Sequence, residues 1–129
     1  TPPTFFVYVL GLVFRLVLSK GGITSMNAAS DLKSSLVYDV IDSSNGFYHS
    51  AINPSNRSRM NFPFRFGGPS GIDDFEIKFL DEAKSHIMIS LIGHRSVGGI
   101  RNSLFNADTL DETKALVALM KSFQAKLQS

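Results

Sequence analysis

The sequence predicts an α+β fold with two layers, in which helices cover one face of a small mixed or antiparallel sheet. Two observations carry this prediction. Helical and strand-like hydrophobic periodicities follow one another in the order two helices, two strands, helix, two strands, helix. Turn signals between the strand-like segments suit hairpin-like returns rather than long crossovers. With 129 residues, the chain has the size of one domain spanning residues 1–129.

The composition narrows the class of protein. Hydrophobic residues make up 43% of the chain and charged residues 19%, which is typical of a soluble folded protein. Thirteen basic and eleven acidic residues give a formal charge of +2, so we expect no nucleic-acid partner, which would call for a concentrated basic face. The chain has no cysteine, which excludes disulfides and thiolate metal sites and fits a reducing compartment.

The first helix should begin after Pro2 and Pro3 and end near Ser19, before Gly21–Gly22. It is apolar on nearly every side. The apolar run 5–18 is shorter than the roughly 20 residues of a membrane helix, and it contains Arg15. A signal peptide requires a basic segment before its apolar region, and no such segment precedes this helix. We therefore expect no membrane partner. The helix should be packed on nearly all sides, with a packing partner outside this chain.

The next segments are a helix and two strands. Apolar residues recur at helical spacing over 23–41, and "DSSNG" then signals a turn. Residues 47–52 form a short aromatic strand. Residues 57–66 alternate between apolar and polar positions, as a half-buried strand does, and Pro63 indicates an edge or a bulge. The polar face comprises Arg57, Arg59, Asn61 and Arg65, and its three arginines should form a solvated surface, with a subunit contact as the alternative.

The remainder of the chain predicts a helix, two strands and a last helix. An amphipathic helix should span 73–86, with acidic residues in its first turns. Buried strands should cover 87–93 and 99–106. Thr109 is a suitable N-cap for the last helix, and Glu112 three residues later would complete a capping box.

The segment "GHRSVGGIRNS" contains the strongest candidate site. It brings His94, Arg95 and Arg101 close to the glycine pair Gly98–Gly99. An arginine fork matches a carboxylate or phosphate, a glycine allows close approach, and a histidine can donate to the same anion. The same residues would equally suit a hairpin whose glycines set the turn and whose arginines are solvated. The spacing alone does not decide between these interpretations. No metal-ligand spacing or phosphate loop is present in the sequence.

Four segments resemble, in this order, segments of the phosphoserine aminotransferase family: "TPPTF", "DSSNGFY", "NRSRMNFPFRF" and "GHRSVGGIRNSLFNA". The resemblance covers essentially the whole chain and identifies it with the carboxy-terminal small domain of these class-V, fold-type-I enzymes. It implies pyridoxal 5'-phosphate as cofactor and a homodimer. It also implies amino-group transfer between L-glutamate and 3-phosphohydroxypyruvate, which gives O-phospho-L-serine and 2-oxoglutarate in serine biosynthesis.

The resemblance also implies roles for single residues. Arg101 would hold the α-carboxylate of the substrate, and His94 and Arg95 would receive its phosphate or the side-chain carboxylate of glutamate. Thr1 would reach the cofactor phosphate of the neighbouring subunit. In this family the Schiff-base lysine lies upstream of "TPPTF", so we expect the chain alone to be inactive. The alternative function is a truncated, non-catalytic module that binds a partner or a phosphorylated metabolite.

Two positions depart from the family pattern. Asn102 replaces a usual alanine and Asp108 a usual methionine. We expect both residues on exposed positions. The carboxylate of Asp108, near the anion site, would weaken the binding of an anion there. For the whole protein we expect a cytoplasmic location, with an organelle as the alternative.

Overall fold

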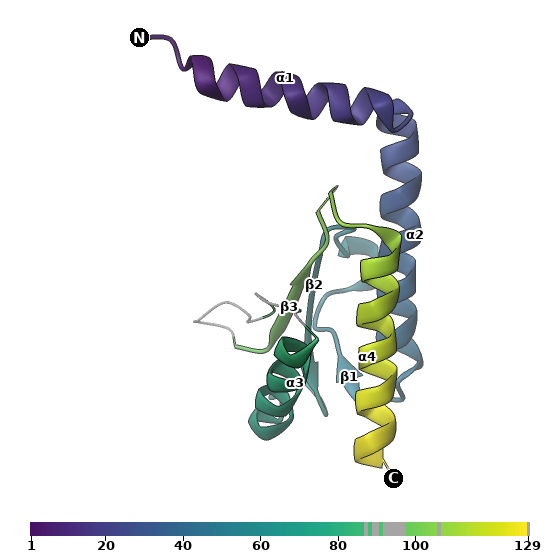
Figure 1. The fold of residues 1–129 in the computed structure, drawn as a ribbon. Coiled ribbons are helices and arrows are strands. Elements are labelled where there is room, and N and C mark those ends of the chain that lie inside the picture. Colours follow the sequence, from purple (N-terminus) through teal and green to yellow (C-terminus); the bar gives the residue numbers. More distant parts are fainter. Residues whose placement is uncertain (87, 89–90, 92–97, 106, 129) are drawn as a thin grey trace.

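The computed structural model describes residues 1–86, 88, 91, 98–105 and 107–128. They form an α+β fold of four helices and a three-stranded antiparallel sheet, as the sequence predicts (Figure 1). The predicted strand 87–93 lies almost wholly outside the described residues. The elements are α1 (Thr4–Ser19), α2 (Gly22–Ser43), β1 (Tyr48–His49), the 3-10 turn η1 (Pro54–Asn56), β2 (Asn61–Phe66), α3 (Asp73–Ser85), β3 (Ile100–Ser103) and α4 (Leu110–Gln128).

The sheet has the order β1-β2-β3, with β2 in the centre. Pro63 therefore lies in a central strand and not at an edge. It is tolerated because β1 pairs with only the last two residues of β2, where Tyr48 faces Phe66. Pro63 faces Arg101 across β2 and β3, and the Arg101 amide donates to the Leu91 carbonyl, away from β2. This is a non-hydrogen-bonded pair of the ladder, so the nitrogen of Pro63 points to the side where β1 has already ended.

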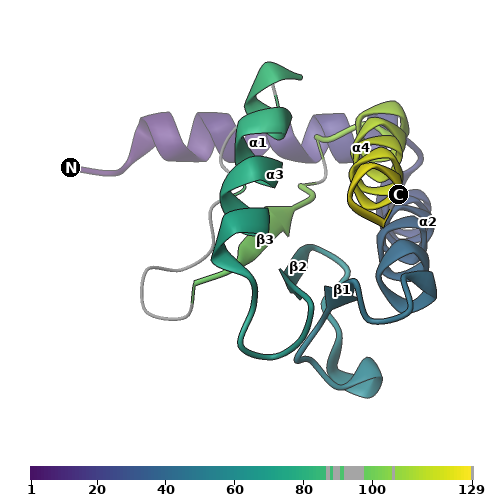
Figure 2. The same ribbon diagram turned by 90° about the horizontal axis from the view of Figure 1, so that it is seen from below.

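One face of the sheet carries the hydrophobic core. Phe62, Phe64 and Phe66 alternate along β2 and are all buried, as the sequence pattern predicts. Buried residues of three helices complete the core, namely Val37, Val40 and Ile41 of α2, Phe79 and Ala83 of α3, and Leu116, Leu119, Met120 and Phe123 of α4. Figures 1 and 2 show α4 running beside α2. The helices that belong to the core thus cover one face of the sheet.

Polar contacts join these layers. The hydroxyl of Tyr48 in β1 donates to the Met120 carbonyl in α4 at 2.7 Å, and burial raises the pKa of this tyrosine. The predicted capping box at α4 is confirmed. The Glu112 amide donates to Thr109 Oγ1 at 3.2 Å, and the Thr109 amide donates to the Glu112 carboxylate. That backbone donor lowers the pKa of Glu112.

Helix α1 lies apart from the core. It extends away from the sheet and has no buried residue within the described part of the chain (Figure 1). Phe5, Phe6 and Leu18 are 70%, 72% and 74% exposed. The helix therefore lacks the packing on all sides that its sequence predicts, and the surface that would cover it is not among the described residues. It ends before Gly21, whose φ of +93° sets the bend into α2.

The apolar character of α1 does not by itself make a membrane span. Within the described residues, no single helix is long and apolar enough to cross a bilayer. Only α1 and α2 taken together reach that length and composition, and they are bent by 78° relative to each other.

Candidate functional site

The second face of the sheet, opposite the core, carries polar side chains from all three strands. The antiparallel register places His49 beside Arg65, Pro63 beside Arg101, and Asn61 beside Ser103. The Ser103 hydroxyl donates to the Asn61 side-chain oxygen at 2.8 Å. We call this surface, defined by the six residues of these pairs, the outer face. It holds two arginines and a histidine in neighbouring positions.

Arg101 is the exposed cation of the outer face. Its backbone is fixed, because its amide donates to the Leu91 carbonyl at 2.9 Å. Within the described residues its guanidinium makes no ion pair or hydrogen bond. A fixed backbone with an uncompensated guanidinium is what recognition of an external carboxylate or phosphate requires.

The other predicted site residues are not brought to Arg101 by the described part of the chain. His94 and Arg95 lie outside the described residues. Thr1 is exposed at the free end of α1, far from the sheet (Figure 1). Within this chain Thr1 and Arg101 therefore do not share a site, and the role of Thr1 at a neighbouring subunit stays a prediction.

The glycine pair before β3 has an unexpected neighbour. Gly98 and Gly99 both have left-handed backbones, with φ of +70° and +77°. A Cβ atom added to Gly99 would lie 3.1 Å from Arg65 Cγ and 3.1 Å from the Phe64 carbonyl oxygen. One added to Gly98 would lie 3.3 Å from a terminal nitrogen of Arg65. The pair therefore makes room for strand β2 and the Arg65 side chain.

Arg65 is not solvated, contrary to the prediction from the sequence. Its side chain is 25% exposed, and its Nε donates to Glu76 Oε1 at 3.0 Å. Asp73 lies 3.5 Å from the same guanidinium. The hydrogen bond with Glu76 raises the pKa of Arg65 above its usual value, so Arg65 is a permanent cation. The only sequence signal for this pair is the acidic cluster at the start of α3, which helix capping explains equally well.

The prediction that the three arginines are solvated was also wrong for Arg57, and it was right for Arg59. Both precede β2, because the Ser58 hydroxyl accepts from the amides of Met60 and Asn61 and holds the chain in a local turn. Arg57 makes two hydrogen bonds of 2.6 Å to Asp42 and lies 4.5 Å from the ring centroid of Tyr38, with a side chain that is 15% exposed. Arg59 is 51% exposed and pairs with Asp31.

A cavity of about 270 Å3 opens beside Arg65. Its walls come from the loop after β1, from β2 and from the residues around the glycine pair. They are mainly apolar, with His49 and Arg65 as the polar groups; the lining comprises His49, Ala51, Ile52, Pro63, Phe64, Arg65, Pro69, Gly98 and Ile100. Pro63 links this cavity to Arg101, its partner in the ladder. The outer face thus combines an exposed arginine, Arg101, with a cavity that can receive part of a ligand.

The two departures from the family pattern do not lie where we expected them. Asn102 is buried on the core side of β3, opposite Phe62, and its Nδ2 has no hydrogen-bond partner among the residues that the structure describes. Alternation along β3 puts it on the face away from Arg101. Asp108 follows β3 at the end away from the glycine pair, and its carboxylate accepts from the Phe105 amide. Its charge is therefore engaged in a local turn.

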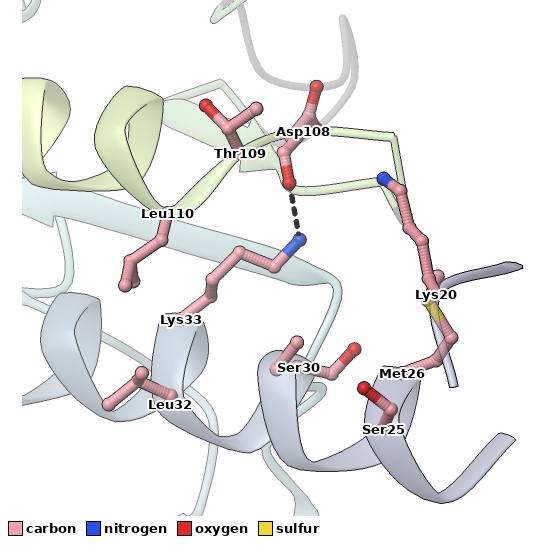
Figure 3. A pocket seen from close by; sticks show the side chains of 10 residues that line it. Lys20, Ser25, Met26, Ser30, Leu32, Lys33, Asp108, Thr109 and Leu110 are labelled. Atoms are coloured by element: carbon pink, nitrogen blue, oxygen red, sulfur yellow. Dashed lines mark hydrogen bonds between the residues drawn. The ribbon is translucent and has the colours of Figure 1, made fainter. Parts of the chain in front are cut away.

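A second cavity, of about 360 Å3, lies between α2 and the start of α4 (Figure 3). Lys33 on its wall is only 4% exposed. The Lys33 ammonium donates to the carbonyls of Phe105 and Asp108 at 2.9 Å each. Lys33 thus anchors the turn that follows β3, and its nitrogen is occupied by protein acceptors.

The described residues offer no set of three His, Cys, Asp or Glu side chains for a metal ion. All seven lysines of the chain lie on helices or at a helix end, none on the outer face. The outer face therefore offers arginines that could bind and orient an anion, and it offers no lysine amine.

Comparison with known proteins identifies a family. The profile of the family described as aminotransferase class-V matches residues 1–116. The phosphoserine aminotransferase of Drosophila melanogaster is 53% identical over 123 residues, which are 95% of this chain and 34% of that protein. The probable phosphoserine aminotransferase of Caenorhabditis elegans is 51% identical over 124 residues, 96% of this chain and 34% of that protein.

Solved structures give the same result. The phosphoserine aminotransferase of Bacillus circulans subsp. alkalophilus superposes with a TM-score of 0.90 at 36% identity, over 98% of this chain and 34% of that one. The pyridoxal-phosphate-bound enzyme of Trichomonas vaginalis superposes with a TM-score of 0.85 at 38% identity, over 94% of this chain and 34% of that one. The chain spans about a third of the length of the relatives it matches.

Proposed function

The chain belongs to the class-V aminotransferase family, and on this premise we propose that it is the substrate-binding part of a phosphoserine aminotransferase. The whole enzyme would transfer an amino group between L-glutamate and 3-phosphohydroxypyruvate, giving O-phospho-L-serine and 2-oxoglutarate. The observation that carries the proposal is Arg101, an exposed arginine with a fixed backbone and no internal counterion among the described residues. The comparisons do not favour a non-catalytic module, since the relatives are aminotransferases.

The chemistry of the substrates fits the outer face. Each substrate carries an α-carboxylate and a second anionic group. The planar fork of Arg101 would hold the α-carboxylate by two parallel hydrogen bonds and so orient the reacting carbon. His94 and Arg95 remain the predicted partners of the phosphate or of the second carboxylate. With a second cationic subsite in addition to Arg101, the whole enzyme would accept both substrates in turn.

This chain would supply Arg101 for the substrate and Thr1 for the phosphate of a pyridoxal-phosphate cofactor. When bound, the cofactor draws electrons from the amino-bearing carbon and carries the amino group between the two substrates. Arg101 would hold the substrate while this occurs, and Thr1 is the proposed contact to the cofactor phosphate of a neighbouring subunit. Lys33 is excluded as the Schiff-base residue by its burial and its two carbonyl partners. The family resemblance implies that this lysine belongs to the two-thirds of the enzyme that this chain does not span.

The exposed apolar surface of α1 supports a proposal about the assembly of the whole enzyme. The exposed apolar surface of this helix would be covered by the upstream part of the enzyme, within a homodimer. We also propose a cytoplasmic location, which agrees with the lack of cysteine. Size-exclusion chromatography of the whole enzyme and imaging of a tagged copy in cells test these two statements separately.

A chimaera tests the proposed activity. The segment of the Drosophila enzyme that aligns with this chain is replaced by residues 1–129, and transamination of 3-phosphohydroxypyruvate by glutamate is measured. We expect activity, and we expect Arg101→Ala to raise KM by roughly 10- to 100-fold through loss of a charge-assisted bidentate contact.

The matched control is Arg59→Ala, which removes an exposed, ion-paired arginine outside the outer face. It should leave both kinetic parameters within about twofold. A pure, folded chimaera without activity would refute the proposed function. Unchanged kinetics of Arg101→Ala would refute the role of Arg101.

A further inference from the structure

We propose that Arg65 is a positioning residue for the site: it packs the Gly98–Gly99 corner in place and thereby fixes the direction in which Arg101 is presented. The proposal rests on the proposed function where substrate binding is the readout. Its structural part concerns only described residues and can be tested without activity.

The guanidinium of Arg65 is held from the side of α3. Its Nε donates to Glu76 Oε1 at 3.0 Å, and its terminal nitrogen lies 3.5 Å from Asp73. The Glu76 side chain is only 10% exposed. A partly desolvated ion pair between two side chains on rigid elements fixes the orientation of both. Arg65 therefore has one defined position relative to α3.

The same guanidinium is enclosed by glycines from two different turns. Gly71 belongs to the turn between β2 and α3, and a Cβ atom there would lie 2.5 Å from Arg65 Nε and 2.6 Å from its Cζ. Gly98 and Gly99 approach from the other turn, at 3.3 Å from a terminal nitrogen and 3.1 Å from Cγ by the same measure. Arg65 thus fills the space between the turn after β2 and the corner before β3.

This packing bears on Arg101 because the corner leads directly into β3. Two successive glycines have more backbone freedom than any other pair, so their conformation has to be fixed by what they pack against. Arg101 lies two residues after Gly99. Its partner in the ladder is Pro63, which lies two residues before Arg65 in β2. Loss of the Arg65 side chain would loosen the corner, and the fork of Arg101 would be less well directed at the carboxylate.

The first test substitutes Arg65→Met in the chimaera, which keeps the length of the side chain but removes its ion pair. We expect KM for both substrates to rise about tenfold while kcat stays within about twofold, because substrate orientation is lost and the chemistry is untouched. Arg59→Met is the matched control, with no expected change in either parameter. Equal kinetics of Arg65→Met and the unchanged chimaera would overturn the proposal.

The second test asks whether the two turns communicate through Arg65. Gly71→Ala introduces a methyl group against the guanidinium, so it should raise KM several-fold in the chimaera. In an Arg65→Ala background the contact with the guanidinium is gone and only the strain of an alanine at a φ of +74° remains, so Gly71→Ala should raise KM by less than it does beside Arg65. Additive effects of the two substitutions would contradict the proposal, since Gly71 would then act without Arg65.

The third measurement does not depend on activity. Hydrogen exchange of the Ile100 and Arg101 amides should be about tenfold faster in Arg65→Met than in Arg59→Met, because these amides follow the corner directly and the Arg101 amide donates to the Leu91 carbonyl. Unchanged exchange would refute the positioning role. An inactive chimaera with accelerated exchange would refute the proposed function and leave the positioning role supported.

Discussion

The two faces of the sheet are built from alternate residues of the same strand, yet they are stabilised in different ways. On the core face, Phe66 makes ring contacts with Phe47, Tyr48, Phe79 and several other aromatic residues, so each contact is one of many. On the outer face, Arg65 pairs with the two carboxylates of Glu76 and Asp73, and Arg101 has no charged partner among the described residues. The core face is thus stabilised by many ring contacts, whereas the outer face depends on a few specific ion pairs. Substitutions on the core face should change stability, and substitutions on the outer face should change binding.

Phe66→Ala should cause the largest effect. Phe66 is fully buried, and its removal leaves a cavity among aromatic rings from β1, α3 and α4. We expect the free energy of unfolding to fall by about 3–5 kcal/mol in urea denaturation. Phe105→Ala, at a phenylalanine that is 64% exposed, should change it by less than about 0.5 kcal/mol. Similar losses for the two variants would show that the core does not depend on this face.

Lys33→Met tests whether polar groups on the buried side have to be paired. The substitution leaves the carbonyls of Phe105 and Asp108 without the ammonium that now bonds both. We expect a loss of about 2 kcal/mol in the same measurement. Lys78→Met on the exposed side of α3 is the control and should be nearly neutral. A Lys33 variant as stable as the control would mean that water replaces the ammonium.

Asn102→Ala should act in the opposite direction. The Nδ2 of Asn102 is buried without a partner and lies beside a cavity of about 230 Å3. Removing an unpaired buried donor recovers its desolvation cost, less some packing, so we expect a gain of about 1 kcal/mol. A loss of stability instead would show that the amide is hydrogen-bonded in solution.

The ion pair of Arg57 with Asp42 offers a pH-dependent test at a smaller scale. The hydrogen bonds from Arg57 lower the pKa of Asp42 below its usual value, so the pair stabilises the fold above the unfolded pKa near 3.9 and loses this effect as the pH falls through the folded value. Asp42→Asn should therefore be less stable than the unchanged chain at pH 6, by under about 1 kcal/mol because Asp42 is 55% exposed.

The difference between Asp42→Asn and the unchanged chain should narrow as the pH is lowered towards 2, because the folded aspartate also takes up a proton when the pH falls through its lowered pKa. Urea denaturation at several pH values between 6 and 2 measures the difference. A gap that stays constant over this range would show that the charge of Asp42 does not stabilise the fold.

The sequence predicted features that depend on neighbours along the chain. The alternation of Phe62, Phe64 and Phe66 predicted the core face, and Thr109 with Glu112 predicted the start of α4. Features that depend on distant partners were missed. Arg65 looked solvated because Glu76 is brought to it only by the packing of α3 on β2.

The register of β3 was missed for the same reason. Its expected range of 99–106 did not give its pairing with β2, and this pairing alone puts Asn102 inside and Arg101 outside. Helix α1 shows a related limit, since its apolar residues indicate burial but not which surface provides it. Local patterns therefore predicted most elements and one face of the sheet, whereas the composition of the site required the tertiary contacts.

Arg101→Ala should have the smallest effect on stability of all these changes. The side chain is exposed and makes no ion pair within the described residues, so its removal should alter the free energy of unfolding by less than about 0.5 kcal/mol. The same substitution is expected to weaken substrate binding in the chimaera strongly. The division between the two faces would be established if Arg101→Ala lowered the affinity for substrate without lowering stability, and Phe66→Ala lowered stability. A large loss of stability in Arg101→Ala would instead mean that this arginine has a structural partner, and the outer face would lose its free cation.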